Sequence, residues 1–556
     1  MVWYEAFVDA SFSLRFGLPG QEVLLHLDVL SMFFGTLLLP QIAASALAGM
    51  KRAAWFWLFS FGLVFTVAAA SPFALIFGVG LVGAALWYLA VQENISQGIA
   101  YARITAFAVT CLMPALALPV SSLAFVLVVL GVTTLAGLVP FYNGFPRLYV
   151  ALPEAMSGLM SGGAVTIALY ILVRYAFITA AGSQPSWWGV LLMVIGALSV
   201  GRGALKAALA IDLRDVLSWS TVAATGLTVI GIGVALWAKA LGDVVLSGLA
   251  LQAVLLGILA HGLFKPLLFI GAGEVRRAVG TSSLNWLGGL MRGMPRLGAL
   301  MLLGAAGMAA LPLGPDFASI FLLIHALVAM AFHGGSVACL SCAFLLAIVG
   351  SGMALLLLAS IKIIGLGFLG RPRSLHAAAA EDARRGPLWG MALLGGLCLP
   401  VALVPGFILL LCMPVVHAMA PLAQTMALTY APLTLCLLGG GALLALGFIQ
   451  ASKGERKLHE TPTWNGGFFC PPPWLPFGDP QTQPSAGGLA ESMQAAFGLS
   501  VASGWWGRSF LPLRRLCARA VWRALRPRLP APRLELALTL VVMALAMLGL
   551  SLVWVG

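Results

Sequence analysis

The sequence predicts an all-α fold, a polytopic bundle of transmembrane helices of the kind found in a bacterial-type inner membrane. Hydrophobic residues make up 61% of the 556 residues, charged residues only 9%, and mean hydropathy is +1.02. A soluble chain would carry about 25% charged residues, so too little polar material is present to cover a globule in water. The apolar runs are continuous and approach the roughly 20 residues that a spanning helix needs. A membrane barrel would instead give short alternating segments.

The apolar runs predict about 14 to 15 spans. The expected spans are 27–49, 53–71, 73–92, 103–118, 120–140, 158–180, 187–211, 216–238, 244–272, 297–312, 317–332, 336–369, 387–413, 427–450 and 534–555. The short loops at Lys51 and Arg52 and at Arg276 and Arg277 are predicted to be cytoplasmic. Strict alternation does not put every basic loop on one side, so a span is split or merged wrongly between 294 and 386.

The chain divides into three parts by composition. Residues 1–450 form a transmembrane core, and 451–533 form the one long polar stretch, which is Pro-rich at first and basic later. Within this stretch AGGLAESMQAAFGLSVASGWWG favours a helix on the membrane surface, with an ordinary extramembrane loop as the alternative. Residues 534–556 are expected to form a C-terminal transmembrane helix.

The net charge of +13 reflects membrane orientation rather than nucleic-acid binding. The basic residues lie between apolar runs and do not form one soluble face. Their largest cluster precedes the last apolar run: Arg508, Arg514, Arg515, Arg519, Arg523, Arg526, Arg528 and Arg533. This is the pattern of a cytoplasmic loop, with contact to anionic lipid heads.

No motif in the sequence indicates a metal or cofactor bound to this chain. Cys339 and Cys342 have CxxC spacing, but they lie in the apolar run SVACLSCAFLLAIVG without further ligands at motif spacing. They are interpreted as helix-packing residues. The N-terminus lacks a basic segment followed by an apolar core, so no cleavable signal peptide is expected.

Function is sought in ionisable groups inside apolar runs, because a charge there costs roughly 2.5–3.5 kcal/mol or more. His261 and Lys265 in LQAVLLGILAHGLFKPLLFIGAGEV are four residues apart and share one helix face. There an imidazole could exchange a proton with an amine. Pro266 is expected to disturb the helix and free carbonyl groups. The alternative is that the lysine extends to the headgroup region.

Three further residues complete the predicted ion path. Lys362 lies in GMALLLLASIKIIGLGFLGRPRS, with extension to the headgroups as its alternative. His325 lies in the middle of FASIFLLIHALVAM and is either a relay residue or a packing histidine. Glu154 lies beside a Pro-broken segment and is either a loop anchor or a channel acid.

Other charged residues near span ends are given less weight. Arg202 and Lys206 are expected to extend toward the headgroups. Asp212, Arg214 and Asp215 are expected in a loop.

At these residues the chain resembles the antiporter-like subunits of complex I, multisubunit cation/proton antiporters and membrane-bound hydrogenases. The similarity is carried by RDVLSWSTVAATG and HGLFKPLLFIGAGEV, and by AGLVPFYNGFPRLYVALPEA and LMSGG. SIKIIGLGFLGRPRS and TPTWNGGF resemble the branch of hydrogenase-4 component B and the formate hydrogenlyase membrane subunit. The resemblance runs from about Leu27 to the end.

The resemblance implies an antiporter-like fold with broken helices, in a large membrane-arm subunit beside a nickel–iron hydrogenase or similar redox module. Other membrane and peripheral subunits would be its partners. The nickel–iron centre and iron–sulfur clusters would belong to those partners, whose electron transfer would drive a proton or sodium path. His261 and Lys265 match the family's HALFK-type motif, and Lys362 matches the lysine of a later broken helix.

The sequence also departs from the family pattern. No acid stands in IFGVGLVG at 76–83, where the family has a membrane glutamate. Leu135 and Thr166 replace lysines, and Ala223 replaces a glutamate. Residues that usually follow PEA are missing, and the usual acid near Ile320 is absent. The first half of the pathway is therefore depleted, which puts a full pumping cycle in doubt.

Three hypotheses from different classes remain open. The chain is a proton- or cation-translocating subunit of an oxidoreductase complex, a non-translocating scaffold of such a complex, or a stand-alone cation/proton transporter. The last would need a midplane substrate site with broken helices. Gene neighbours discriminate among the three.

Overall fold

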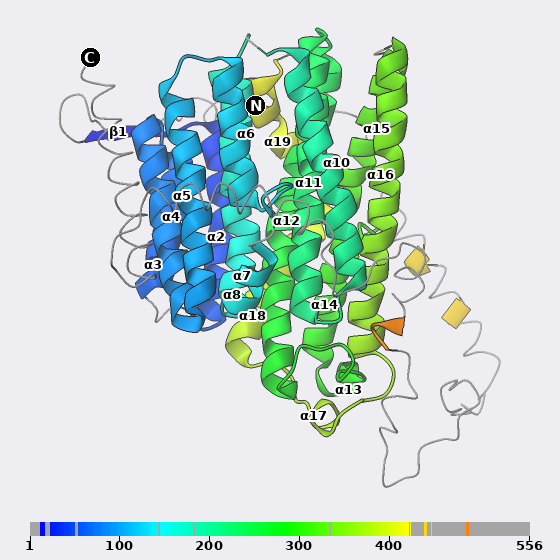
Figure 1. The fold of residues 1–556 in the computed structure, drawn as a ribbon. Helices are drawn as coiled ribbons and strands as arrows, with labels where there is room; N and C mark the ends of the chain where they lie inside the picture. Colours follow the sequence, from blue (N-terminus) through cyan, green and yellow to red (C-terminus); the bar gives the residue numbers. More distant parts are fainter. Residues whose placement is uncertain are drawn as a thin grey trace, which may run out of the picture.

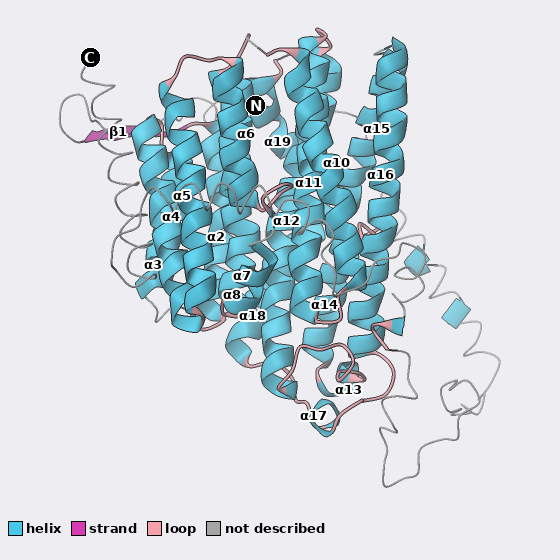
Figure 2. Ribbon diagram, viewed as in Figure 1, coloured by secondary structure: helices cyan, strands magenta, loops and turns pink. Residues whose placement is uncertain are grey.

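The computed structural model describes residues 12–16, 23–50, 54–142, 145–182, 184–333 and 335–421, with short pieces at 423, 439–441, 446–447 and 485–488. Within these ranges the chain is a bundle of upright helices packed side by side (Figures 1 and 2). Nine of the described helices are long and apolar enough to cross a membrane. The predicted all-α transmembrane class is confirmed. The predicted spans 427–450 and 534–555 and most of the polar stretch 451–533 lie outside the described residues.

One feature departs from the all-α prediction. Strands β1 (Phe12–Phe16) and β2 (Val23–Leu27) form an antiparallel pair ahead of the first helix. The β2 segment VLLHL is too short for a span, and its backbone pairs with β1 instead. The transmembrane bundle then begins at Asp28, which caps helix α2 by accepting a hydrogen bond from the Ser31 amide.

The first four helices run up and down in chain order. They are α2 (Val29–Leu47), α3 (Ala54–Ala68), α4 (Pro72–Glu93) and α5 (Ile95–Ala117). Ser71 and Asn94 cap α4 and α5 by accepting backbone amide hydrogen bonds. α3, α4 and α5 pack as successive neighbours at one side of the bundle (Figure 1).

The next crossing is made of two short helices. α6 (Ser122–Ala136) ends at Gly137, whose φ of 65° is the left-handed conformation that glycine adopts without strain. α7 (Phe145–Ala151) follows after a turn. The chain then crosses back through α8 (Glu154–Leu159), the π-helical turn η3 (Met160–Ala164), α9 (Val165–Val173) and the π-helical turn η4 (Arg174–Thr179).

The centre of the bundle consists of α10 (Ser186–Leu209), α11 (Leu213–Ala240) and α12 (Val244–Val279). Glycines allow α10 and α11 to approach at backbone distance: a methyl group built on Gly196 would lie 2.6 Å from the carbonyl oxygen of Gly226. α12 continues as one α-helix through Pro266. The proline leaves the Gly262 carbonyl without its usual amide donor, in line with the expectation that it frees carbonyl groups.

The error suspected between 294 and 386 lies in the predicted spans 297–312 and 317–332. α13 (Leu290–Gly293) precedes α14 (Pro295–Met308), which starts beside the C-terminal end of α12. After a turn, α15 (Phe317–His333) continues toward the N-terminal end of α12, where His333 lies 3.9 Å from Asp243. The two predicted spans are therefore halves of one broken crossing, and alternation is restored.

The remaining described helices complete two further crossings. α16 (Gly335–Ile361) runs into the π-helical segment η5 (Lys362–Phe368). After the short α17 (Leu375–Ala378), α18 (Arg385–Leu403) and α19 (Pro405–Met419) follow each other with a break at Val404.

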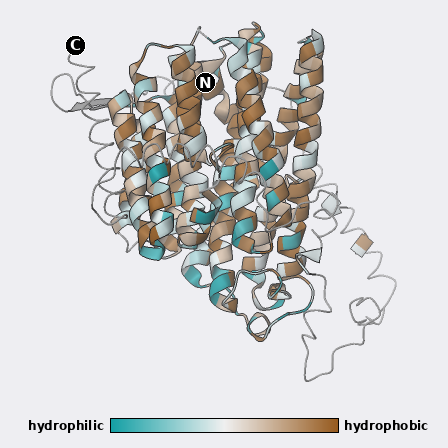
Figure 3. Ribbon diagram, in the orientation of Figure 1, coloured by the Kyte–Doolittle hydropathy of each residue, from teal (hydrophilic) through white to brown (hydrophobic). Residues whose placement is uncertain are grey.

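Basic residues gather at one end of the bundle, which we call the basic end: Arg276, Arg277, Arg371, Arg384 and Arg385. Contacts join its segments, because the carboxylate of Glu274 binds Arg277 and Arg384. The hydrophilic colour in Figure 3 gathers at this lower end, near α13 and α17, while the helices above are mainly hydrophobic. This charge asymmetry is that of a membrane protein with one preferred orientation.

Candidate functional site

The middle of α12 carries the two ionisable residues that the sequence singled out. His261 is 7% exposed and Lys265 is fully buried, so the headgroup alternative for Lys265 does not apply. The i, i+4 spacing puts both on one face, as predicted. α12 is the most surrounded helix, contacting α2, α8, α11, α14, α15, α18 and α19, and these neighbours keep both side chains from lipid.

The amine of Lys265 is held by α11. Its Nζ donates to the Leu217 carbonyl oxygen at 3.1 Å and to the Ser220 hydroxyl at 2.5 Å. Thr221, next on the same helix, hydrogen-bonds the Ser161 hydroxyl at 2.9 Å. Ser161 belongs to η3, and π-helical turns in membrane helices are frequent at functional sites. α11 therefore supplies both acceptors of the Lys265 amine, and η3 bonds to α11 at the next residue.

His261 lines a small cavity of about 20 Å³ whose wall is mostly apolar. Asp316, Ser319 and Thr228 line the same cavity. A cavity holds one water when its volume exceeds about 10–15 Å³ and polar partners surround it, so this one fits a single water molecule. Neither ring nitrogen of His261 makes a hydrogen bond of standard geometry within the described part of the chain.

Asp316 is the acidic residue that sequence reasoning missed. It is 7% exposed, and its Oδ1 accepts a hydrogen bond from the Ser319 hydroxyl at 2.5 Å. It lies in the turn between α14 and α15, one helical turn before Ile320, where the acid of related sequences was found absent. Position 320 is not an acid, as the sequence indicated, but Asp316 supplies a buried carboxylate one turn earlier. The spacing of four residues between Asp316 and Ile320 could have revealed it.

A second missed polar group is Gln41 of α2. It is fully buried, and neither atom of its side-chain amide has a hydrogen-bond partner among the described residues. Its amide packs where a methyl group on Gly162 or on Gly262 would lie, 2.7 Å away in each case. Glycines in η3 and α12 thus admit a neutral polar side chain beside His261. Gln41 is the one side-chain amide in a helix that otherwise contains apolar and small hydroxyl residues, which is the signal that could have found it.

Lys362 is buried at a separate place. As the first residue of η5, it is fully buried and its Nζ donates to the carbonyl oxygens of Ala208 and Ala210 at 2.7 and 2.6 Å. These carbonyls belong to the C-terminal end of α10, where a positive charge is favourable. The lysine therefore does not extend to a headgroup, and its amine joins η5 to α10.

Glu154 lies at the basic end. Its carboxylate is 2.8 Å from Arg276 Nε and 3.4 Å from Arg214 Nη1. A cavity of about 560 Å³ opens there, lined by both arginines and by Glu93. Eight residues of α12 separate Gly273, which packs on Glu154, from Lys265, a distance of about 12 Å along the helix. Glu154 thus belongs to this open cavity, which we call the mouth, rather than to the buried cluster.

The expected loop at 212–215 is wrong in part. Asp212 caps α11, but Arg214 and Asp215 belong to its first turn. Arg214 is 2% exposed and donates to the carbonyl oxygens of Tyr149 and Leu152 at 2.9 and 2.6 Å. These bonds join the start of α11 to the end of α7 at the edge of the mouth.

His325 is not brought into the cluster. Its Nδ1 lies 2.9 Å from the Phe321 carbonyl oxygen, and its ring packs on the Phe321 ring at 4.3 Å between centroids. These contacts are those of a packing histidine on α15. The cavity beside His261 is lined by Ser319, Ile320 and Leu323 of this helix instead.

The positions that depart from the family pattern are buried and neutral. Leu135 is 8% exposed, Thr166 is 2% exposed, and Ala223 is fully buried. Thr166 donates its hydroxyl to the Gly162 carbonyl, within its own helix. Within the described ranges, the buried charge of the bundle thus concentrates on α11, α12, the turn before α15 and η5. No group of three or more potential metal ligands comes together in these ranges.

The fold and the cluster define a multi-pass membrane protein of the antiporter-like class, with broken crossings around a buried lysine. Comparison with known families agrees. The model of the NADH:quinone oxidoreductase/Mrp antiporter transmembrane family matches residues 25–347. The chain belongs to this family.

Individual relatives fall within the same class. Hydrogenase-4 component B of Escherichia coli (strain K12) is 31% identical over 299 residues, which cover 54% of this chain and 44% of that protein. Formate hydrogenlyase subunit 3 of the same organism is 32% identical over 274 residues, covering 49% and 44%. The matched part is thus less than half of either relative.

A solved structure shares the fold over nearly the whole chain. A chain of the membrane-bound sulfane sulfur reductase, an archaeal respiratory membrane complex, superposes with a TM-score of 0.73 at 18% identity. The superposition covers 99% of this chain and 93% of that one. At this identity the likeness establishes the architecture.

Proposed function

We propose that this chain is a membrane-arm subunit of a hydrogenase-4-like or complex I-like oxidoreductase complex and takes part in moving protons, or a cation, across the membrane. The observation that carries the proposal is the fully buried amine of Lys265, which donates to two neutral oxygens of α11 and has His261 one turn earlier on α12. An ionisable group kept in the membrane interior at such cost marks an ion path or relay.

The cluster places titratable groups beside a cavity that has room for water. His261 and Asp316 share a cavity that fits one water, which would pass a proton between imidazole and carboxylate. Ser220, Thr221 and Ser161 extend the polar surface from Lys265 into η3. The mouth at Glu154 and Arg276 would provide exchange with water at the basic end. The amine of Lys362, bonded to the end of α10, would respond to a change of charge on Lys265.

The redox chemistry would belong to partner subunits. Electron transfer through a nickel–iron centre and iron–sulfur clusters in peripheral partners would shift the charge of Lys265 and its neighbours. The chain would reside in a bacterial-type inner membrane with the basic end toward the cytoplasm, because positively charged loops remain on that side.

A non-translocating scaffold is the second candidate, favoured by the neutral residues Leu135, Thr166 and Ala223. They leave one position each of α6, α9 and α11 without the charge of related sequences. A stand-alone cation/proton transporter is the third, for which the break between α14 and α15 beside Asp316 would supply a midplane site. Neighbouring genes for hydrogenase-like subunits favour the first two, and an isolated gene favours the third.

Proton uptake by inverted membrane vesicles tests the proposal. Vesicles that contain the whole complex are energised through the redox reaction of the partners, and acidification is followed with a fluorescent dye. Lys265→Ala is expected to remove the share of the uptake that passes through this subunit. Lys239→Ala is the matched control, because Lys239 bonds the Met419 carbonyl at the far end of α11. If vesicles with Lys265→Ala take up protons as well as the control vesicles, the relay is refuted and the scaffold role remains.

A further inference from the structure

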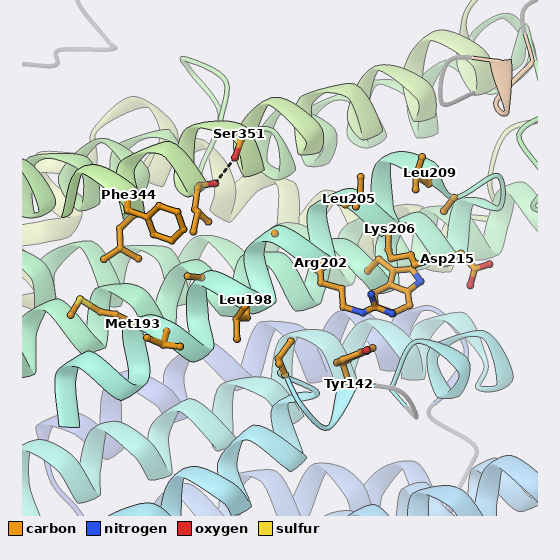
Figure 4. A pocket seen from close by; sticks show the side chains of 18 of the residues that line it. Tyr142, Met193, Leu198, Arg202, Leu205, Lys206, Leu209, Asp215, Phe344 and Ser351 are labelled. Atoms are coloured by element: carbon orange, nitrogen blue, oxygen red, sulfur yellow. Dashed lines mark hydrogen bonds between the residues drawn. The ribbon is translucent and has the colours of Figure 1, made fainter. Parts of the chain in front are cut away.

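A large crevice opens on the outer side of the bundle between α10 and α16. Its volume is about 1110 Å³, above the usual range of about 300–1,000 Å³ for compact small-molecule sites. It shares neither His261 nor Lys265 with the proton-path cluster. Figure 4 shows its walls, with Met193 and Leu198 of α10 facing Phe344 and Ser351 of α16.

Most of the crevice is apolar and open to the surroundings of the bundle. Val190, Val194 and Leu198 follow one another at one-turn spacing along α10 and are 41%, 51% and 55% exposed. Phe344 of α16 is 68% exposed on the opposite wall. Because both helices cross the membrane, the groove between them runs in the direction of lipid acyl chains.

One end of the crevice is cationic. Arg202 and Lys206 lie one turn apart near the C-terminal end of α10, and both line the crevice. The guanidinium of Arg202 stacks over the Tyr142 ring at 4.6 Å. Its Nε is buried without a hydrogen-bond partner among the described residues. In the described part of the chain, neither cation has a carboxylate oxygen within 4.0 Å.

Two carboxylates also reach this end but do not neutralise the pair. Asp212 accepts hydrogen bonds from the Ser282 hydroxyl and the Arg214 amide as the cap of α11. Asp215 lies to one side of Arg202 and Lys206 in Figure 4, and no ion pair joins it to either side chain. Two adjacent cations at the end of an apolar groove thus repel each other with no anion between them.

We propose that this crevice binds an anionic phospholipid of the bilayer. Its phosphate would lie between Arg202 and Lys206, and its acyl chains would lie along Val194, Leu198 and Phe344. The complementarity is twofold, because the unpaired cations fit a phosphate and the apolar walls fit hydrocarbon. Free phosphate would match only the cationic end, and an apolar helix of a partner would leave both cations unpaired.

Native mass spectrometry of the full chain in detergent tests this site. Phosphatidylglycerol or phosphatidylcholine with the same acyl chains is titrated into wild type and into the double variant Arg202→Gln, Lys206→Gln. At about 1 kcal/mol for each cation near a lipid phosphate, we expect phosphatidylglycerol to bind wild type about 25-fold more tightly than the variant. Phosphatidylcholine should bind both more weakly, and excess inorganic phosphate should not displace phosphatidylglycerol.

The control variant is Arg292→Gln, Arg385→Gln, which removes the same charge from exposed positions at the basic end. It should bind phosphatidylglycerol like wild type. Equal loss in both double variants would overturn the site, as would equal binding of the two lipids by wild type. If inorganic phosphate displaced phosphatidylglycerol, the lipid proposal would be overturned, and only an anion-binding site at the cationic end would remain. Thermal melting of each variant establishes that the comparison is made on folded protein.

Discussion

Asp316 provides a sharp test of the buried cluster, because asparagine replaces its carboxylate at nearly the same size. Asp316→Asn keeps an acceptor for the Ser319 hydroxyl, now 2.5 Å away, and keeps the cavity of about 20 Å³. Near-isosteric replacement should therefore cost less than about 1.5 kcal/mol of stability. It removes a proton acceptor from the cavity shared with His261. Since a positioned acid or base contributes about 10²–10⁴-fold, the part of the proton flux that this subunit carries should fall at least about 100-fold.

The assay is redox-driven proton uptake by vesicles, normalised to electron transfer and to the amount of subunit in the membrane. Asp243→Asn is the control, because Asp243 caps α12 at its far end and asparagine caps helices equally well. Gly257→Ala supplies an independent variant: its methyl group would lie 3.4 Å from Ser319 Oγ and 4.0 Å from Asp316 Oδ1. It would take up space that a water molecule in the cavity needs, without changing charge. Flux at the control level in both variants would refute the role of this cavity.

Three further predictions concern stability, measured by thermal melting of the detergent-solubilised chain. Lys362→Met leaves two carbonyl oxygens at the end of α10 without their charged donor, which should cost about 1–3 kcal/mol; an unchanged melting temperature would contradict this role. Gly196→Ala forces α10 from α11 and should cost about 1–3 kcal/mol, whereas Gly201→Ala, with open space around its methyl group, should cost little. Glu274→Gln should cost about 1 kcal/mol, and less at high salt, because its arginine partners are 40% and 61% exposed.

Hydrophobic run length predicted most of the described bundle, because lipid requires each crossing to satisfy its own backbone hydrogen bonds. It failed where one crossing is made of two short helices. The turn before Asp316 looks like a loop between separate spans, and only the packing of both α14 and α15 on α12 shows that they form one crossing. The sequence could not show that α12 continues through Pro266, because that depends on the neighbouring helices that pack on it.

The cost of a buried charge identified Lys265 and Lys362, whose contacts could not be derived from sequence. The carbonyl oxygens that hold them come from α11 and α10, more than 40 residues away in each case. Gln41 and Asp316 were missed because each lies outside the motif positions that carried the resemblance. Glu154 and His325 show the limit of residue type alone: one belongs to a surface ion-pair network and the other to helix packing.

The number of protons moved per electron by the purified, reconstituted complex tests the central claim most directly. Wild-type subunit and Lys265→Ala are compared at equal rates of electron transfer, so that assembly defects do not enter the ratio. The buried-relay account predicts that the ratio falls in the variant by the share of protons that this subunit carries. An unchanged ratio in a fully assembled complex would contradict it.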